Sequence, residues 1–290
     1  MPHPLVTILA GPTASGKSAK ALELADSRPS LVINADSAQV YDHLPILTNQ
    51  PSAAELAAVP HALVGFLPST APYSVGQWLQ DAQTAIDQAV ANGQHPIVVG
   101  GTGLYLKALT KGLAVMPAIP PIIREQALAL MEMGEEVLRG ALAVRDPLSA
   151  SRIRPRDFVR LLRAYEVVMA SGRAIWDWQQ TPVPPPPYRF HTTLLLPDRA
   201  LLYQRINQRF AAMVDAGAVE EVAAVLARYN DPTTIPASLH KVLGFAQLQA
   251  YVQGALSLEA AIDQAAQATR HYAKRQYTWF RHQGLDARDA

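Results

Sequence analysis

Apolar positions in the first hundred residues fall into short runs that are separated by segments with helical spacing. The runs are short enough to be buried strands, and they lie at residues 5–10, 31–35 and 96–99. Residues 17–26 and 78–92 lie between them and repeat their apolar side chains with the period of a helix. Strands that alternate with helices predict an α/β fold with a parallel sheet and right-handed crossovers.

The pattern changes near Met116, where three prolines open a stretch that is mainly helical in spacing. This stretch closes at Pro182 and at Pro184–Pro187, a run expected to be stiff and extended. A strand at residues 191–196 then returns to the sheet, and one helix is expected over residues 198–228. The predicted segments are a core of residues 1–115, a small helical insertion of residues 116–187, and a second part of the core, residues 188–290, with C-terminal helices.

Composition narrows the class of protein. Hydrophobic residues make up 49% of the 290 positions, which is enough for a sizeable core. Cysteine is absent, which excludes disulfides, thiol catalysis and cysteine-ligated metals. No segment reaches the roughly 18 to 20 uncharged apolar residues of a membrane span, and a strand-like run follows the N-terminus without a basic leader. We expect a cytoplasmic protein without membrane contact.

Charge is distributed unevenly, although the formal net charge is only +1. The first hundred residues carry three basic and seven acidic side chains, so the remaining residues carry a balance of +5. Two basic clusters lie near residues 152–173 and 270–281. Basic helix faces are often merely solvated, so charge alone leaves nucleic-acid binding open.

The most specific local motif is a phosphate loop. Residues 11–18 fit G-x-x-x-x-G-K-[ST] directly after a strand and before a helix. Backbone N–H groups of such a loop and the following helix N-terminus hold phosphate oxygens, as in ATP-binding and other nucleotide-binding proteins. Lys17 neutralises charge, and Ser18 is the candidate Mg²⁺ ligand. The candidate diphosphate-binding residues are Gly11, Pro12, Thr13, Ala14, Ser15, Gly16, Lys17 and Ser18.

Two features are unusual for an ATPase or GTPase. After the strand at 96–99 the chain reads Gly-Gly-Thr-Gly, residues 100–103, where many nucleoside triphosphatases carry a Walker B aspartate. Asp36 follows the second strand, and in a parallel sheet the strand ends and the phosphate loop share one crevice. Asp36 is therefore expected to face the phosphate loop, unless it serves only as a cap of the next turn.

These motifs and the C-terminal segment resemble the bacterial tRNA dimethylallyltransferase family, also called isopentenyl-adenosine transferases. The resemblance runs along almost the whole chain, and its most specific part is Thr-Arg-His-Tyr-Ala-Lys-Arg-Gln-Tyr-Thr-Trp-Phe at residues 269–280. The other matching segments are residues 11–18, 36–41, 100–106, 160–167 and 199–206. The resemblance implies a P-loop enzyme, a prenyltransferase that acts in tRNA processing.

The resemblance implies that dimethylallyl diphosphate donates its dimethylallyl group to the N6 amine of the adenosine 3′-adjacent to the anticodon, with release of diphosphate. Asp36 matches the base that takes a proton from the amine, which is a poor nucleophile by itself. Thr13 matches a threonine that helps hold the diphosphate. Arg209 matches an arginine that stabilises the departing charge together with Lys17 and Mg²⁺. Arg205, one turn earlier, is expected to be solvated.

The acceptor adenosine is stacked in the anticodon loop, so it must be extruded before its amine can be reached. A helix that starts at Pro155 would align Arg156, Arg160 and Arg163 on one basic stripe. By family match, the tRNA-contacting residues are Asp36, Ser37, Ala38, Gln39, Thr102, Arg124, Val159, Arg160, Leu161, Leu162, Arg163, Lys241, Val242, Leu243, Gly244, Phe245 and Ala246.

The chain departs from the family pattern in two places. Residues 47–51 read Leu-Thr-Asn-Gln-Pro, where the family usually has Gly-Thr-Ala-Lys-Pro. Residues 244–246 read Gly-Phe-Ala in place of Gly-Tyr and a polar residue. Both changes concern local RNA contacts and leave the phosphate loop and Asp36 intact. We expect a monomer that uses Mg²⁺, has no zinc, and has the tRNA anticodon stem-loop and dimethylallyl diphosphate as partners.

Three other functions compete with this interpretation. A small-molecule kinase would use the phosphate loop but not the segment at residues 269–280. A prenyltransferase acting on free adenylate would have no need of the basic helical insertion. A non-enzymatic RNA-binding module would not need both an intact phosphate loop and Asp36.

Overall fold

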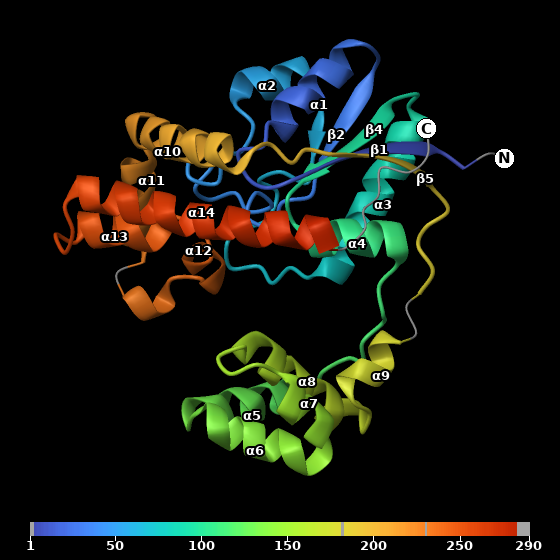
Figure 1. Ribbon diagram of the computed structural model, residues 1–290, viewed down its shortest axis with the longest axis vertical. Coiled ribbons are helices and arrows are strands. Elements are labelled where there is room, and N and C mark those ends of the chain that lie inside the picture. Colours follow the sequence, from blue (N-terminus) through green and yellow to red (C-terminus); the bar gives the residue numbers. More distant parts are fainter. Residues whose placement is uncertain (1–2, 181–182, 230, 283–290) are drawn as a thin grey trace. The chain divides into compact units, whose positions relative to one another are not determined.

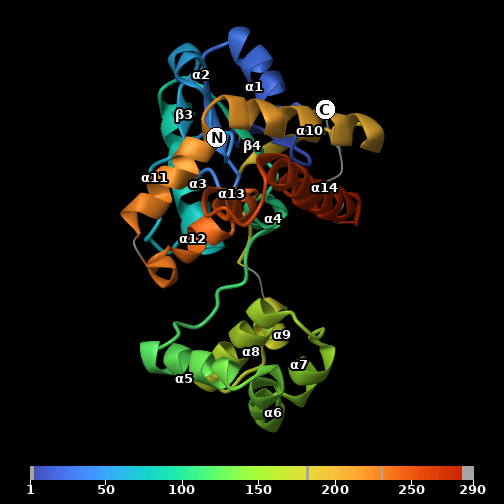
Figure 2. The same ribbon diagram turned by 90° about the vertical axis from the view of Figure 1, so that its left-hand side faces the viewer.

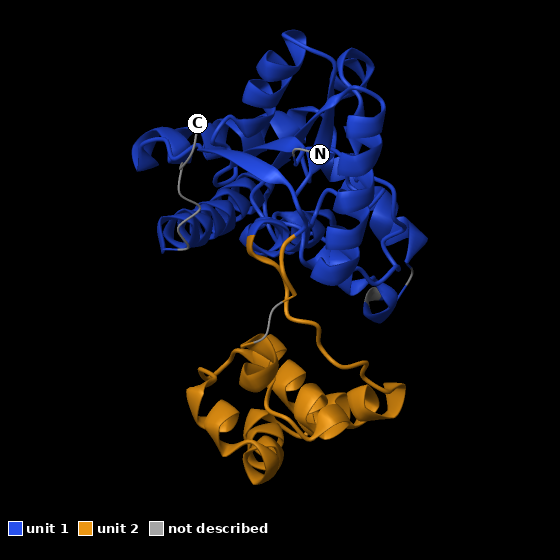
Figure 3. Cartoon of the chain, turned by 90° about the vertical axis from the view of Figure 1, so that its right-hand side faces the viewer, with its two compact units in different colours: residues 1–110, 186–290 blue, residues 111–185 orange. Residues whose placement is uncertain are grey.

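The computed structural model describes residues 3–180, 183–229 and 231–282 and divides into two compact units (Figure 3). Unit 1 consists of residues 1–110 and 186–290, and unit 2 of residues 111–185. Unit 2 takes the place of the insertion expected at residues 116–187, and its limits lie a few residues earlier at both ends. Pro182, expected to close the insertion, lies outside the described residues.

Unit 1 is built on a five-stranded parallel sheet with the order β3-β2-β4-β1-β5 (Figure 1). In register, Ala10 of β1 lies opposite Gly100 of β4 and Leu194 of β5, so these three strands end at the same edge. The sheet confirms the α/β class expected from the sequence. The strands are β1 (Leu5–Ala10), β2 (Ser30–Asn34), β3 (His61–Ala62), β4 (His95–Gly100) and β5 (Arg189–Leu194).

Helices cover both faces of the sheet in unit 1 (Figures 1 and 2). The helices of unit 1 are α1 (Lys17–Asp26), α2 (Ala53–Ala58), α3 (Val75–Ala91), α4 (Gly103–Lys111), α10 (Arg199–Asp215), α11 (Ala218–Arg228), the 3-10 helix η1 (Pro232–Thr234), α12 (Ala237–His240), α13 (Phe245–Val252) and α14 (Leu258–His282).

Alternate side chains of the strands enter two different cores. Ile8 and Val98 lie in the core that contains Trp78 of α3 and Phe280 of α14. Leu9 points to the opposite face, where it packs with α1. Because successive side chains of a strand point to opposite faces, a sheet that is covered on both sides needs continuous apolar strands. This explains the short apolar runs from which the sheet was predicted.

The single helix expected over residues 198–228 is wrong. Helix α10 ends at Asp215 and α11 begins at Ala218, with Gly217 between them at φ +107°. This left-handed backbone interrupts the helix, and glycine adopts it without the clash that a Cβ atom causes. The chain therefore turns, and α11 packs against α10 and α13 in a second core of unit 1 (Figure 2).

Unit 2 is a bundle of short helices around Leu138, Leu142 and Leu161, all fully buried. Among its described residues, and among those of unit 1, no helix is both long and apolar enough to cross a membrane. The helices of unit 2 are α5 (Pro121–Glu132), α6 (Glu135–Arg145), α7 (Pro147–Arg152), α8 (Phe158–Ser171) and α9 (Ile175–Gln179).

The helix start expected at Pro155 is also wrong. The carboxylate of Asp157 accepts the backbone N–H of Arg160 at 3.4 Å and acts as the N-cap of α8. Arg156 lies outside the helix at φ +65°, and its N–H donates to both carboxylate oxygens of Glu135 at 3.1 and 3.0 Å. The basic stripe on α8 therefore consists of Arg160 and Arg163 alone.

Candidate functional site: a phosphate loop beside a strand-end carboxylate

The phosphate loop connects β1 to α1 and has the tight backbone that its glycines permit. A Cβ atom on Gly11 would lie 2.4 Å from the carbonyl oxygen of Leu195, so only glycine fits there. Ala14 and Gly16 have left-handed backbones, at φ +62° and +94°. Alternation of left- and right-handed residues turns successive N–H groups toward one point, which favours an anion. The start of α1 adds the positive end of the helix dipole.

Two cations lie at this loop. The Lys17 ammonium donates to the carbonyl of Pro12 at 2.6 Å and lies 3.4 Å from the Ser15 hydroxyl. The Arg209 guanidinium, from α10, donates to the Thr13 hydroxyl at 2.5 Å. Burial lowers the pKa of Lys17 to about 8, with the Asp36 carboxylate opposing and Arg209 reinforcing this shift. The structure therefore gathers a positive cluster suited to a multiply charged anion.

Asp36 lies two residues beyond β2 and is held there by its neighbour Asn34. The Asn34 side chain accepts the N–H of Asp36 at 2.8 Å and donates to the carbonyl of Asp36 at 3.0 Å. Trp78 of α3 donates to the Asn34 carbonyl at 2.9 Å, which anchors the strand end. One carboxylate oxygen of Asp36 accepts the N–H of Ala38 at 2.9 Å. Asp36 therefore caps the turn that follows it, which is the alternative role expected from the sequence.

Asp36 also acts electrostatically on the phosphate loop. Burial lowers the pKa of Arg209, and the Asp36 carboxylate raises it, as it does for Lys17. A carboxylate and two cations therefore share one electrostatic environment, although they come from the loop after β2, from α1 and from α10. This arrangement can hold a leaving anion on the cations while the carboxylate takes a proton from a nucleophile.

The strand-end loops bring several of the expected RNA-contacting residues together. The hydroxyl of Thr102 accepts the backbone N–H of Ser37 at 3.0 Å, joining the loops after β2 and β4. Gln39 donates to the carbonyls of Thr48 and Asn49 at 3.1 and 2.6 Å. The residues expected around Asp36 and Thr102 therefore form one surface beside the phosphate loop. Arg124 and residues 159–163 belong to unit 2.

Residues 241–246 differ in what they can offer to RNA. Lys241 and Ala246 are exposed, whereas Val242 and Phe245 are buried in the core of α10, α11 and α13. Gly244 leaves room for the ring of Phe210, which would lie 2.6 Å from a Cβ atom at this position. RNA contact from the buried residues would have to come from their backbone, and their role in binding stays a prediction.

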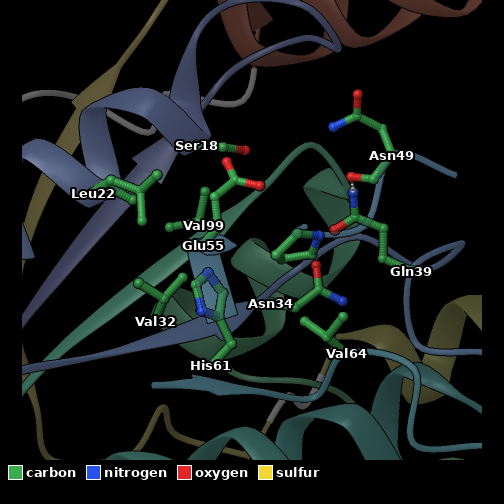
Figure 4. Close-up of a pocket in the computed structure, with 12 residues that line it drawn as sticks. Ser18, Leu22, Val32, Asn34, Gln39, Asn49, Glu55, His61, Val64 and Val99 are labelled. Carbon is green, nitrogen blue, oxygen red and sulfur yellow. Dashed lines mark hydrogen bonds between the residues drawn. The ribbon is translucent and has the colours of Figure 1, made fainter. Parts of the chain in front are cut away.

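A cavity that is open to solvent lies beside α1 (Figure 4). Ser18 and Leu22 line it from α1, and Val32 and Val99 line it from the sheet. Figure 4 shows the carboxylate of Glu55 on the same side of the cavity as the Ser18 hydroxyl. No cluster of three or more metal-ligating His, Cys, Asp or Glu residues exists in the described part of the chain.

A family model and curated proteins match this chain over most of its length. The IPP transferase family model matches residues 39–283, and the isopentenyl transferase model matches residues 4–62. A protein of Nitrobacter hamburgensis named tRNA dimethylallyltransferase is 48% identical over 95% of this chain and 87% of its own length. A protein of Agrobacterium fabrum with the same name is 47% identical over 95% of this chain and 93% of its own length. The chain belongs to the IPP transferase family.

Solved structures of IPP transferases have the same fold. A tRNA isopentenylpyrophosphate transferase from Staphylococcus epidermidis has a TM-score of 0.66 and 31% identity, over 96% of this chain and 90% of the other. A eukaryotic dimethylallyltransferase acting on tRNA has a TM-score of 0.81 and 27% identity, over 96% of this chain and 70% of the other. The fold of this chain is therefore shared with these two transferases along almost its whole length.

The departure of this IPP transferase at residues 47–51 has a structural explanation. Leu47 is 5% exposed and belongs to the second core of unit 1. Its backbone N–H and that of Ile46 donate to the carboxylate of Glu221 at 3.0 and 2.8 Å. Gln50 donates to the carbonyl of Tyr41 at 2.7 Å. The residues of this chain that differ from the family pattern, Leu47 and Gln50, thus contribute to packing and to the shape of the loop. The sequence pattern alone did not reveal these roles.

Sequence reasoning missed three residues near the site of this IPP transferase. Asn34 shapes the turn that carries Asp36, and Gln276 contacts the phosphate loop. Burial raises the pKa of Tyr272, and the Asp36 carboxylate adds to this shift, so the phenol is close to the site. A polar residue at the end of a buried strand was a signal for Asn34. The other two lie on α14, in the specific segment at residues 269–280, but that segment gave no role for either residue.

Arg205, expected to be solvated, is exposed but has a defined neighbour. Its guanidinium lies 4.0 Å from where a Cβ atom of Gly16 would be. Arg205 thus places a third positive charge beside Gly16 of the phosphate loop of this IPP transferase.

Proposed function

We propose that this IPP transferase moves the dimethylallyl group of dimethylallyl diphosphate to the N6 amine of the adenosine 3′-adjacent to the anticodon in tRNA. The tRNA dimethylallyltransferase activity is that of its relatives over most of the chain. The observation that carries the chemical detail is the position of the Asp36 carboxylate next to the cations of the phosphate loop. A cytoplasmic location and a monomeric state are parts of this proposal.

The donor binds with its diphosphate on the phosphate loop. Loop N–H groups, Lys17 and Arg209 surround the anion, and Thr13 presents its hydroxyl from the same loop. When the allylic C–O bond breaks, its electrons leave with the diphosphate, and the added charge develops where these cations already are. Such preorganised stabilisation is worth about 10²- to 10³-fold in rate for one donor group.

The acceptor amine forms the new C–N bond and loses a proton to Asp36. One carboxylate oxygen of Asp36 holds the turn through Ala38, and the carboxylate has further lone pairs for an amine proton. Base catalysis of this kind contributes about 10²- to 10⁴-fold. The resulting balance is one C–N bond formed, one C–O bond broken, and one proton transferred to the carboxylate.

Mg²⁺ fits this site as a partner of the donor. Mg²⁺ at phosphate sites takes one or two protein ligands and completes its shell with phosphate oxygens and water. Ser18 offers its hydroxyl at the start of α1, on the wall of the cavity beside the loop. When bound, Mg²⁺ would supply charge neutralisation of the diphosphate, in addition to Lys17 and Arg209.

The transfer itself is tested with labelled dimethylallyl diphosphate, total tRNA and Mg²⁺, followed by nucleoside analysis. We expect label in N6-dimethylallyl adenosine of tRNA and inorganic diphosphate as the second product. Parallel reactions replace tRNA by adenylate, or the donor by ATP with small acceptors. Transfer to free adenylate instead of tRNA, or phosphorylation of a small acceptor, would contradict the proposal.

The RNA surface of unit 2 gives a first prediction. Arg160 has a side chain that is 73% exposed, whereas Arg163 pairs with the buried Glu166 at 3.3 Å. We therefore combine Arg160→Ala with Arg163→Gln, because glutamine can still donate to Glu166. The double variant should bind tRNA more weakly. The slope of log affinity against log salt concentration should become less steep by up to about one unit for each phosphate contact that is lost.

The control for this prediction is Arg145→Ala, which removes an exposed arginine of α6 in the same unit. The measurement is tRNA affinity between about 50 and 200 mM salt, the range over which phosphate contacts change affinity strongly. Donor binding should be equal in all three proteins. A salt slope of the double variant equal to that of wild type would show that these arginines are merely solvated.

The Lys17 ammonium gives a prediction about pH. Its pKa is about 8 in the ligand-free protein, and a bound diphosphate must raise it, because the anion stabilises the charged form. Lys17 is charged below pH 8, so binding there needs no proton. At pH 8 binding should take up about half a proton per protein molecule, and at higher pH this uptake should approach one proton. Affinity should therefore fall as pH rises through this range.

Calorimetry of diphosphate binding in two buffers with different ionisation enthalpies measures this proton uptake directly. Lys17→Met serves as the reference, because proton uptake that remains in it belongs to the diphosphate itself. Equal proton uptake by wild type and Lys17→Met at pH 8.5 would contradict the role of Lys17.

A further inference from the structure

Gln276 of α14 is a buried amide that joins two loops distant in the sequence. Its side chain is almost inaccessible, with the residue 6% exposed. The amide oxygen accepts the backbone N–H of Thr13 at 2.9 Å, and the amide nitrogen donates to the carbonyl of Gly101 at 2.8 Å. Both partners are backbone groups, one a donor and one an acceptor, so the orientation of the amide is determined.

The Gly-Gly-Thr-Gly run after β4 is shaped to receive this part of α14. A Cβ atom on Gly101 would lie 2.3 Å from the amide nitrogen of Gln276. A Cβ atom on Gly103 would lie 2.4 Å from the ring of Trp279, one turn along the same helix. Both distances are too short for a real side chain. The run that replaces a Walker B segment is therefore a surface on which α14 packs.

The contact with Gln276 leaves Thr13 with a particular capacity. Its N–H is taken by Gln276, and its hydroxyl oxygen accepts from Arg209 at 2.5 Å. A hydroxyl that accepts from a cation retains its own proton for another acceptor. In the donor complex the Thr13 hydroxyl can therefore donate a hydrogen bond to a diphosphate oxygen. Gln276 thereby fixes the position of Thr13, which contacts the donor. Gln276 itself does not contact the donor.

We propose that Gln276 is a positioning residue of the donor site, which holds Thr13 in place against the Gly101 turn so that the Thr13 hydroxyl meets the diphosphate. This inference rests on the proposed function, since it assumes a diphosphate on the phosphate loop. Loss of the amide would leave the N–H of Thr13 and the carbonyl of Gly101 buried without their partner, and the loop would shift to satisfy them.

The first test replaces Gln276 by methionine, which keeps the length of the side chain but offers neither hydrogen bond. Gln267→Met is the matched control, because Gln267 is exposed on the same helix. The probe is inorganic diphosphate, whose Kd is measured together with the KM for the donor, kcat, the Kd for tRNA, and Tm. We expect Gln276→Met to weaken diphosphate binding and raise donor KM by about tenfold or more, with tRNA affinity unchanged.

A second variant separates positioning from support of the fold. Gln276→Glu keeps the acceptor for Thr13, but an ionised carboxylate has no proton for the carbonyl of Gly101. A protonated carboxyl group has both a donor and an acceptor, and burial favours this neutral form. The ratio of diphosphate Kd values, variant to wild type, should therefore fall between pH 8.5 and pH 5.5. Ionisation of the diphosphate itself is common to both proteins and cancels in the ratio.

The outcomes are distinct. If wild type does not bind diphosphate at all, the proposed function fails, and this inference with it. If wild type binds diphosphate and Gln276→Met lowers only Tm, with Kd and donor KM within about twofold of wild type, Gln276 merely supports the fold and the inference is overturned. A Kd ratio for Gln276→Glu that stays raised at pH 5.5, where the neutral carboxyl group offers both hydrogen bonds, would also overturn it.

Discussion

Asp36→Asn is expected to lower kcat of tRNA prenylation by about 10²- to 10⁴-fold, which is the typical contribution of a general base. Asparagine keeps the oxygen that accepts the N–H of Ala38, and asparagine caps turns about as well as aspartate. The contacts of the backbone of Asp36 with Asn34 are independent of the side chain that is replaced. The substitution thus removes basicity and leaves the turn intact.

Single-turnover transfer with tRNA and donor both saturating is the measurement, because it isolates the chemical step. Tm and the Kd for tRNA should stay close to wild type. Asp26→Asn, which changes an exposed carboxylate at the end of α1, is the control. If Asp36→Asn stays within a few-fold of wild type, the role of Asp36 is that of a cap, and the base must be sought elsewhere.

Lys17→Ala is expected to reduce turnover by about 10²-fold or more and to weaken donor binding, as for other lost charge-stabilising groups. Lys17 is the lysine of the phosphate loop, and its ammonium is already directed into the loop by the carbonyl of Pro12. Without it, the diphosphate would lose the ammonium that lies within the loop itself. The loss should appear in both kcat and kcat/KM, because charge on the diphosphate grows in the transition state.

The control for Lys17→Ala is Lys20→Ala, one turn later on α1, where the lysine pairs with Glu23 at 2.6 Å. Labelling rates are compared at limiting and at saturating donor. Equal rates of Lys17→Ala and wild type at both donor concentrations would contradict a diphosphate site on this loop.

The sequence predicted those features correctly that depend on residues close to one another in the chain. The phosphate loop is one continuous segment, and the spacing of its two glycines can be read directly from the sequence. The parallel sheet followed from apolar runs, because strands covered on both faces have to be apolar throughout. The errors at Gly217 and Arg156 arose where a single left-handed residue broke an otherwise helical pattern. Periodicity does not record a change in one backbone angle.

The sequence by itself determined that this chain folds as a P-loop α/β protein and which family it resembles, because these depend on contiguous motifs and on the period of apolar residues. The resemblance named Arg209, but only the tertiary structure decided which residues distant in the sequence meet at the site and through which contacts. Arg209 meets Thr13 and Gln276 meets Gly101 across separations of 196 and 175 residues. Such contacts depend on how α10 and α14 pack on the strand ends, and packing is a property of surfaces that meet only in the folded chain.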